Sequence, residues 1–532
     1  MSTISPDYSE NRPNFLIITT DQHNPTCLGY AGHPVVRTPH IDALAASGMI
    51  FSRAYVSNPL CTPSRVTLFT GLTTRGHRVR MNGIPLSYNV PTMPEALRKA
   101  GYQTHYAGKP HLRTSHTPAG MPLDQVDPHE FPEARDMWRS GRISKLPTPY
   151  YGFEEVRFVN GHGHGSWGEY VNWLDREHPG QAHLFHERTT LVPPSPAADY
   201  YSMSYKWALP AELHPMTWTC ERTIEYLNRY GQAKQAQTLS HDRSPKPFLL
   251  WCSIADPHVP LAPPEPYCYR YSPEMVPPPK RRVGEFEDLP PHIARIYARP
   301  TKGSDIDPHR NECAAHYYGL IEMIDDNVGA VLSALRENGL DQDTVVVFAA
   351  DHGEALGDHG MWGKGPYHYD SVIRVPLILS WPGHIAAGAT HDGVVSLLDF
   401  APTLLDIAGV PIPEGPAPPQ LVGTPQLPPW PGRSLLPVAK GADSGSASGA
   451  LVEDDQDDLG FRLRTLVTDR YRLTAYSGQT YGELFDLQED PDEVHNLWDD
   501  PRHAGVRDEL RIALLDRLIS TDHALLRRMG VS

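Results

Sequence analysis

The sequence lacks any long hydrophobic run. No segment of its 532 residues approaches the ~18 consecutive apolar residues that a membrane-spanning helix needs. The stretch 1–13 is polar and has no apolar core of the kind found in signal peptides. We therefore expect a protein without a membrane segment that stays in the cytoplasm.

Cysteine is also scarce. The six cysteines, at positions 27, 61, 220, 252, 268 and 313, show no paired spacing such as C-x-x-C. Nothing in this spacing indicates a disulfide framework, so we expect reduced thiols. For any one of them, a small buried apolar side chain is the default role.

Positive charge is in deficit. The chain has 47 Lys and Arg against 63 Asp and Glu, for a formal net charge of −16. Most of the surface would repel a polyanion, which argues against a general nucleic-acid binder. A local basic pocket for one small anion is compatible with this balance.

Other residue types are plentiful. Hydrophobic residues make up 40% and charged residues 21%, as in an ordinary globular protein and unlike a disordered chain. The 54 prolines indicate much ordered loop, because proline cannot continue helices or central strands. The 27 histidines favour metal binding or acid–base chemistry.

Buried strands alternate with helices along the first 410 residues. Short apolar runs predict strands, and amphipathic patterns with N-cap and glycine signals predict helices. The strands are 14–20, 247–253 and 344–350, and the helices are 38–48, 94–101 and 316–338. This alternation predicts an α/β fold whose sheet is covered on both faces.

The composition divides the chain further. Residues 1–410 form the expected large domain, with a loop-rich insertion at about 112–244 where periodicity is poor. Residues 411–450 are rich in Pro, Gly and Ser and read as a linker. In 451–532 a hairpin, a third strand at 483–487 and a helix at 505–519 predict a smaller α+β domain.

Two acidic pairs follow buried strands. Asp21-Gln22 ends one strand and Asp351-His352 ends another. Taken singly, each Asp is equally well explained as a cap of the following turn. If the strands are neighbours, both pairs meet at the carboxyl edge of the sheet, where α/β folds bind ligands. Oxygen and imidazole ligands then favour a divalent cation.

The pentapeptide Cys61-Thr62-Pro63-Ser64-Arg65 matches C-x-P-S-R. This motif resembles the signature of the type I sulfatases of the alkaline phosphatase superfamily, in which a separate formylglycine-generating enzyme oxidises the Cys to formylglycine. The resemblance runs from Asn14 to about Pro376. Besides the two acidic pairs, it includes Gly108-Lys109-x-His111, Asp256-Pro257-His258 and Gly363-Lys364.

The resemblance implies a fold, a reaction and a set of roles. The fold would be an alkaline phosphatase-like large domain with a central mixed sheet between helices, plus a smaller C-terminal α+β domain. The reaction would be hydrolysis of a small anionic sulfate ester, of arylsulfatase type, with the hydrated formylglycine as nucleophile and one divalent metal. Asp21, Gln22, residue 61, Asp351 and His352 would hold the metal; Arg65 and Lys109 would anchor residue 61; His111 would be the base; His258 and Lys364 would bind sulfate and protonate the leaving group. Alone, each lysine would be read as a surface residue, but the flanking glycines favour the site.

The sequence departs from the commonest sulfatase pattern at two positions. Many sulfatases carry Asp-Asp and Asp-Asn where this chain has Asp21-Gln22 and Asp351-His352. An imidazole ligand favours manganese over calcium, although calcium remains compatible. Both departures resemble the choline-sulfatase and phosphonate monoester hydrolase branches. Asn82 matches an active-site Asn of those branches, and it fits an Asn-Gly turn equally well.

Three functions therefore stay open. Lys109 and His111 favour a sulfatase, because characterised phosphonate monoester hydrolases carry Tyr and Thr there. A phosphonate monoester or phosphodiester hydrolase with the same nucleophile is the alternative. A non-catalytic metal-binding homologue is the third, if Cys61 is unmodified. The leaving alcohol is not determined, and a homo-oligomer is compatible with the sequence.

The insertion holds weaker candidates. The histidines of Gly161-His162-Gly163-His164-Gly165 could face the site, although a flexible loop is the better expectation for glycine-spaced histidines. Trp167, Tyr170 and Trp173 form an aromatic wall for the substrate or pack the insertion. Asp358 and His359 follow the second acidic pair and could support its ligands.

Overall fold

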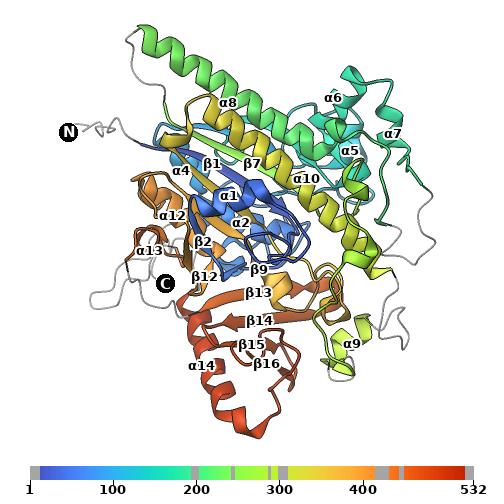
Figure 1. Ribbon diagram of the computed structural model, residues 1–532, viewed down its shortest axis with the longest axis vertical. Coiled ribbons are helices and arrows are strands. Elements are labelled where there is room, and N and C mark those ends of the chain that lie inside the picture. The colour runs from blue at the N-terminus through green and yellow to red at the C-terminus, as the bar shows by residue number, and fades with distance from the viewer. Residues whose placement is uncertain are drawn as a thin grey trace.

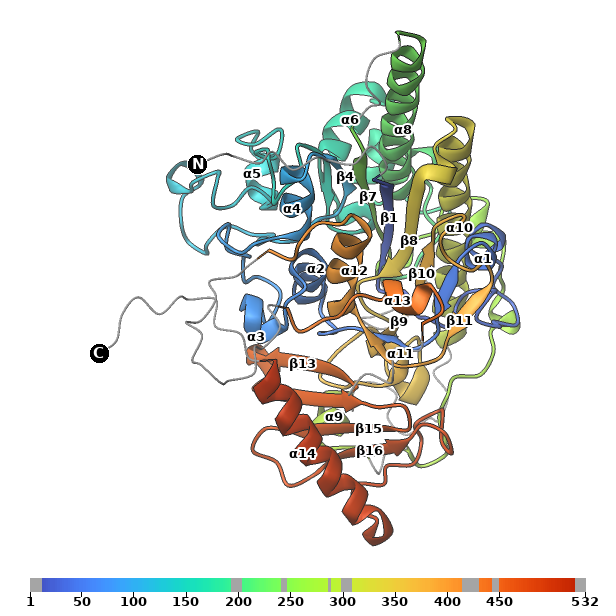
Figure 2. The same ribbon diagram turned by 90° about the vertical axis from the view of Figure 1, so that its left-hand side faces the viewer.

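The computed structural model describes residues 12–192, 203–240, 246–285, 289–297, 309–413, 430–442 and 449–521. A large sheet with helices on both faces occupies most of the molecule, and a small sheet lies at one end (Figures 1 and 2). This confirms the mixed α/β fold with a second, smaller α+β unit.

The central sheet contains nine strands. In spatial order they are β11 (Ala389–His391), β2 (Met49–Phe51), β10 (Leu377–Ser380), β8 (Thr344–Ala350), β1 (Asn14–Asp21), β7 (Phe248–Pro257), β4 (Gln103–Gly108), β5 (Glu155–Asn160) and β6 (Trp167–Gly168). The five strands from β8 to β5 are mutually parallel. β10 pairs antiparallel with β8, and β6 pairs antiparallel with β5, so the sheet is mixed.

Strand β1 shows how the sheet builds two cores. Phe15 and Ile17 belong to one hydrophobic cluster, and Leu16 and Ile18 belong to the other. Alternate side chains of a strand point to opposite faces, and here both faces are buried. The run therefore reads as continuously apolar in the sequence.

Helices cover the two faces. α1 (Pro39–Ala46), α8 (Pro215–Ser240) and α10 (Arg310–Glu337) lie on one face, and α2 (Cys61–Thr70), α4 (Met93–Lys99) and α12 (Phe400–Ile407) lie on the other (Figure 2). Further helices are α3 (Thr74–His77), α5 (Arg135–Arg139), α6 (Glu169–Glu177), α7 (Ala182–His186), α9 (Pro291–Tyr297), α11 (Asp370–Ile373) and α13 (Leu436–Ala439). A small sheet joins β3 (Ala54–Tyr55), β9 (Arg374–Val375) and β12 (Val395–Ser396).

The C-terminal unit is an antiparallel sheet with one helix. Its strands are β13 (Ala450–Gln456), β14 (Phe461–Val467), β15 (Tyr471–Tyr476) and β16 (Gly482–Asp486), and α14 (Ala504–Ser520) packs against them (Figure 1). β13 also contacts the loop that precedes α2. The Glu453 N–H donates to the Ser57 carbonyl at 2.8 Å, and the Asn58 amide donates to the Glu453 carbonyl at 2.5 Å. The small unit thus holds the segment that leads into Cys61.

The stretch 112–244 is more regular than expected. A loop-rich insertion is expected there, but it contains β5, β6, α5, α6, α7 and most notably α8, a helix of 26 residues. Met216, Cys220 and Leu227 of α8 are buried in the core shared with α10. These apolar residues recur at helical spacing, but the buried Thr219 and Thr223 among them obscure the pattern.

Two other expectations concern the linker at 411–450 and the cysteines. Much of the expected linker 411–450 lies outside the described residues, which exclude 414–429 and 443–448. All six cysteines are free and buried. Among the described helices, none combines the length and the apolar character that crossing a bilayer requires.

Candidate active site

The two acidic strand ends are adjacent. β1 and β8 pair in register with Thr20 opposite Ala350, so Asp21 and Asp351 leave the sheet at the same level. The Gln22 N–H donates to Asp351 Oδ1 at 3.2 Å. Gln22 has φ 60°, which turns the chain sharply after the strand. The acidic pairs thus meet at the carboxyl edge of the sheet, as expected.

Cys61 stands at the first position of α2 and is buried. Its Sγ lies 3.7 Å from Asp21 Oδ1, 3.2 Å from His352 Nε2 and 3.1 Å from Lys364 Nζ. Burial opposes ionisation of the thiol, but the cations around it, Lys364 first among them, outweigh burial. The pKa of Cys61 therefore lies well below its ordinary value.

A divalent cation fits the group formed around Cys61. Each of four buried residues offers a ligand atom, and these atoms all lie within 4.8 Å of one another: Asp21, Cys61, Asp351 and His352. Burial and the neighbouring Asp21 raise the pKa of Asp351, as expected where two carboxylates crowd together. A cation between them would relieve that repulsion, and the oxygen and imidazole donors suit one.

Gln22 is held by other partners. Its amide oxygen accepts a hydrogen bond from Lys364 Nζ at 2.8 Å, and its amide nitrogen donates to the Glu354 carboxylate. The other carboxylate oxygen of Glu354 accepts the Leu356 and Gly363 N–H groups. Its role as a metal ligand thus stays a prediction, and the sequence analysis missed Glu354 as the residue that orients it.

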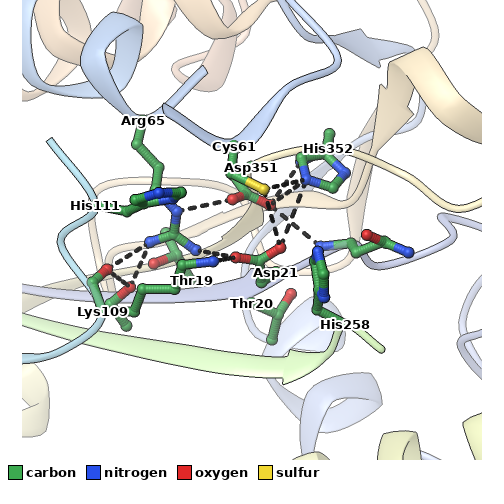
Figure 3. Close-up of polar contacts among 12 residues, drawn as sticks. Thr19, Thr20, Asp21, Cys61, Arg65, Lys109, His111, His258, Asp351 and His352 are labelled. Atoms are coloured by element: carbon green, nitrogen blue, oxygen red, sulfur yellow. Dashed lines mark hydrogen bonds and ion pairs between the residues drawn. The ribbon is translucent and has the colours of Figure 1, made fainter. Parts of the chain in front are cut away.

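Arg65 connects the acidic residues to the sheet. Its buried guanidinium donates to Asp351 Oδ2 at 2.8 Å and to Asp21 Oδ2 at 2.9 Å. It also donates to the Lys109 carbonyl at 2.6 Å and to Ser253 Oγ at 2.8 Å. Figure 3 shows Arg65 and Lys109 reaching Asp21 from one side and His352 from the other.

Lys109 is fully buried beside Asp21. Its Nζ lies 2.6 Å from Asp21 Oδ2 and 2.6 Å from His162 Nε2. Burial opposes ionisation of Asp21, but Lys109 and Arg65 outweigh it and hold its pKa well below the usual range. Gly108 precedes Lys109 at φ 110°, where a Cβ would lie 1.9 Å from the Ser253 carbonyl, so only glycine fits.

His111 follows Lys109 in a strained conformation with φ 50°. Burial lowers its pKa to about 4, so its ring is neutral at pH 7. The ordinary imidazole pKa of ~6.5 does not hold here, because the ring is desolvated. Its Nδ1 is buried and makes no hydrogen bond within the described part of the chain.

His258 follows the end of β7 and faces the same centre. Its ring stacks on that of His162, with centroids 3.6 Å apart and planes 6° apart. The His258 Nδ1 donates to the Val259 carbonyl at 2.7 Å, which leaves Nε2 for other partners. Since His162 contacts both Lys109 and His258, the glycine-rich segment is part of the site, and the expected flexible loop is wrong for His162.

A cavity of about 360 Å³ adjoins this centre. Its lining includes His111, Ser115, His162, His164, Trp167 and His258. Tyr170 and Trp173 instead pack with the insertion's own core. The sequence analysis missed Ser115, and no motif marks it.

Three further candidates have other contacts. The Asn82 side-chain oxygen accepts the Thr62 N–H at 2.9 Å and so supports the start of α2. Asp358 accepts the Lys280 N–H, and His359 pairs with Glu285 at 2.6 Å. Asp358 and His359 therefore bind a neighbouring segment and show no contact with the four metal-binding candidates.

The fold and this site define a hydrolase of the alkaline phosphatase superfamily. The Sulfatase family model matches residues 13–151 and 182–410, and a model described as N-sulphoglucosamine sulphohydrolase, C-terminal, matches 357–519. The chain belongs to the sulfatase family, whose members hydrolyse sulfuric esters.

Individual relatives cover nearly the whole chain. It is 28% identical to an arylsulfatase of Clostridium perfringens over 95% of this chain and 94% of that protein. It is 26% identical to a choline-sulfatase of Rhizobium meliloti over 92% of this chain and 83% of that protein. Among solved structures, the phosphonate monoester hydrolase of Agrobacterium radiobacter matches with a TM-score of 0.76 at 26% identity, covering 96% of each chain.

Proposed function

We propose that the protein hydrolyses a sulfate monoester to an alcohol and inorganic sulfate, with residue 61, as formylglycine, providing the nucleophile. The observation that carries the proposal is the buried group of Asp21, Cys61, Asp351 and His352, flanked by the buried cations of Arg65 and Lys109 and by Lys364. A sulfate ester is anionic, and positive charge placed where its negative charge develops lowers the barrier to attack.

Asp21, Asp351 and His352 would hold one divalent cation, with Gln22 and residue 61 as further ligands. When bound, the ion would supply Lewis-acid stabilisation of the reacting anion. Manganese is the ion that we propose, because the set includes the His352 imidazole, and calcium is the alternative.

Arg65 and Lys109 keep residue 61 and Asp21 in place. Both cations contact Asp21 Oδ2, and Arg65 also holds Asp351, so both carboxylates are oriented and the Asp21 carboxylate stays ionised. Asn82 fixes the N–H of the residue that follows Cys61. The reacting group therefore sits on a helix end that is fixed before substrate arrives.

Proton transfer falls to residues on either side of residue 61. His111 is neutral at pH 7, and its buried Nδ1 has no partner among the described residues, so this nitrogen can take a proton from residue 61 when sulfate is released. Lys364 Nζ lies 3.1 Å from Cys61 Sγ and can bind a sulfate oxygen. The Lys364 ammonium is the donor for the departing alcohol. The His258 Nε2 can donate beside it only when the ring is protonated, because Nδ1 already donates to the Val259 carbonyl.

A phosphonate monoester hydrolase is the second candidate. The likeness to the Agrobacterium radiobacter enzyme and the Gln22 and His352 ligands favour it. Against it, Lys109 places a full positive charge 2.6 Å from Asp21, and His111 supplies a stronger base at neutral pH than a tyrosine hydroxyl.

Residue 61 provides the test. Mass spectrometry of the peptide that contains it, from protein purified from its native host, should show formylglycine in place of cysteine. The variant Cys61→Ala should fold and lose nearly all turnover of an aryl sulfate. An unmodified Cys61 in active protein, or turnover by Cys61→Ala at the wild-type rate, would contradict the proposal and leave a metal-binding homologue as the better account.

A further inference from the structure

One wall of the cavity beside the nucleophile comes from residues 160–167. His111 and His258 line the side that adjoins the reacting centre. The lining also includes Asn160, His162 and Trp167, from the connection between β5 and β6. This connection lies within 152–181, which the Sulfatase family model does not match. The segment is therefore the part of the pocket that general sulfatase chemistry does not explain.

The wall is held rigidly by Glu133. Its buried carboxylate accepts the Asn160 amide at 3.0 Å, the Tyr150 hydroxyl at 2.6 Å and the Leu112 N–H at 3.0 Å. Its carbonyl accepts the Trp167 indole N–H at 2.9 Å. Glu133 thus connects Asn160 and Trp167, at the two ends of the wall, to Leu112, which follows His111. The cavity is therefore preformed.

The lining has no fixed charge. Among the described residues that line the cavity there is no Asp, Glu, Lys or Arg. The His162 Nε2 accepts a hydrogen bond from the Lys109 ammonium, which has donors only, so this nitrogen carries no proton and the imidazole is neutral. A cationic alcohol would lack a counter-charge here, and an anionic alcohol would lack a cation. Leaving either charge unpaired in a partly dry pocket is unfavourable.

The shape of the cavity suits a flat group of limited size. Its volume of about 360 Å³ is near the lower end of the ~300–1,000 Å³ that small-molecule sites occupy. Flat rings, those of His162, His258 and Trp167, form part of its lining. Aromatic and imidazole rings pack well against another flat ring.

We propose that the 160–167 wall selects sulfate esters whose alcohol is uncharged and carries a single flat ring. This rests on the sulfatase function proposed above. It separates the enzyme from one that acts on a quaternary-ammonium alcohol and from one that acts on a sugar bearing further acidic groups.

A charge series with one common ring tests the selection. The substrates are 3-methylphenyl sulfate, its trimethylammonio derivative and its carboxylate derivative, in which the charge sits beyond a methylene and affects the leaving oxygen weakly. We expect the neutral ester to have the lowest KM, with each charged ester higher by about tenfold, the ratio that ~1.4 kcal/mol of unpaired charge produces. An equal or lower KM for either charged ester would overturn the proposal.

Variants of the lining test the same point from the protein side. Met203 lines the cavity and is partly exposed, and its backbone is held by Leu261. Met203→Glu should lower the KM of the trimethylammonio ester by about two- to fivefold, as expected for a solvent-screened ion pair. The matched control is Met275→Glu, at an exposed methionine outside the lining. Equal effects of the two variants would count against the proposal.

A larger side chain at Gly165 tests whether the ring of the substrate binds at this wall. Gly165 lines the cavity, and a Cβ there would meet no atom within 4 Å. Gly165→Leu should raise the KM of the neutral aryl ester about tenfold and leave inhibition by inorganic sulfate unchanged, because sulfate carries no ring. Gly180→Leu, which also meets open space but lies outside the lining, is the control. An unchanged KM in Gly165→Leu would contradict a ring site at this wall.

The two proposals fail in distinguishable ways. Turnover of all three sulfates with no preference for the neutral ester leaves the sulfatase function intact and overturns the selection. Turnover of matched aryl phosphonates without turnover of any sulfate overturns the sulfatase function. In that case the charge series, repeated on phosphonates, decides the selection by the same ranking.

Discussion

Replacing Arg65 by Met removes the one guanidinium that both Asp21 and Asp351 share. Arg65 contacts these buried carboxylates at 2.9 and 2.8 Å and also binds the Lys109 carbonyl and Ser253 Oγ. Methionine fills a similar volume without any donor. Asp351 loses its cationic partner, and Asp21 keeps Lys109 at 2.6 Å.

The expected loss of stability follows from this geometry. Breaking a buried ion pair by removing one partner costs about 3–5 kcal/mol, because the other charge stays buried and uncompensated. We expect a loss of this size in metal-free protein, because Asp351 stays buried after it loses this cationic partner. A divalent cation bound between the carboxylates would restore part of it, because a ligand that binds only the folded state stabilises that state.

Urea denaturation with and without a chelator measures both effects. Arg65→Met should unfold at clearly lower urea than the wild type in chelator, and added manganese should narrow the gap. The control is Arg502→Met, at a surface arginine that is 84% exposed in its pair with Asp500, where no measurable change is expected. A loss below about 1 kcal/mol for Arg65→Met, the value typical of surface pairs, would refute the reasoning.

Three further predictions concern the metal, the base and a buried acid. Chelation should abolish activity, and manganese should restore it better than calcium. Elemental analysis of His352→Ala should show loss of the bound metal. If this variant keeps both the metal and the wild-type rate, His352 is not a ligand. His111→Ala should give a burst of alcohol followed by a stall in stopped-flow kinetics, because release of sulfate needs its Nδ1, whereas the exposed His116→Ala should not. Burial raises the pKa of Glu133 to about 7 from an ordinary 4.5. Between these two pH values, Glu133 is therefore protonated in the folded protein and ionised in the unfolded chain. Stability should therefore fall by roughly 3 kcal/mol as pH rises through that window, and urea titrations of Glu133→Gln at pH 5 and pH 8 should show a much smaller difference than the wild type.

The parts of the fold that the sequence revealed are those with local signals. β1, β7 and β8 are apolar runs buried on both faces, and no other element produces that pattern so clearly. Helix α8 was not recognised, because the buried Thr219 and Thr223 interrupt its apolar spacing. Strand β13 was not predicted, because its sequence, ALVEDDQ, is acidic. Its Glu453 is nevertheless buried, because Arg75 and Arg464 pair with it.

The features of the site also divide into those that local sequence patterns reveal and those that they do not. The acidic pairs and the C-x-P-S-R motif stand at strand and helix ends that local patterns locate. The contacts that orient them join residues far apart in the chain, such as Gln22 with Glu354 and Lys109 with His162. No local pattern pairs these residues, because the contacts form only when the strand ends, the loops that follow them and the insertion pack together. The lowered pKa of His111 has the same origin, since burial is a property of the folded chain.

The most direct test of the central claim is the ratio of two efficiencies. Protein with formylglycine verified at position 61 is assayed for kcat/KM on phenyl sulfate and on the monophenyl ester of methylphosphonic acid, which share one leaving group. The account predicts a clear preference for the sulfate, with the phosphonate as a slower side reaction, because Lys109 and His111 suit attack on a sulfate and its release. A clear preference for the phosphonate would contradict it.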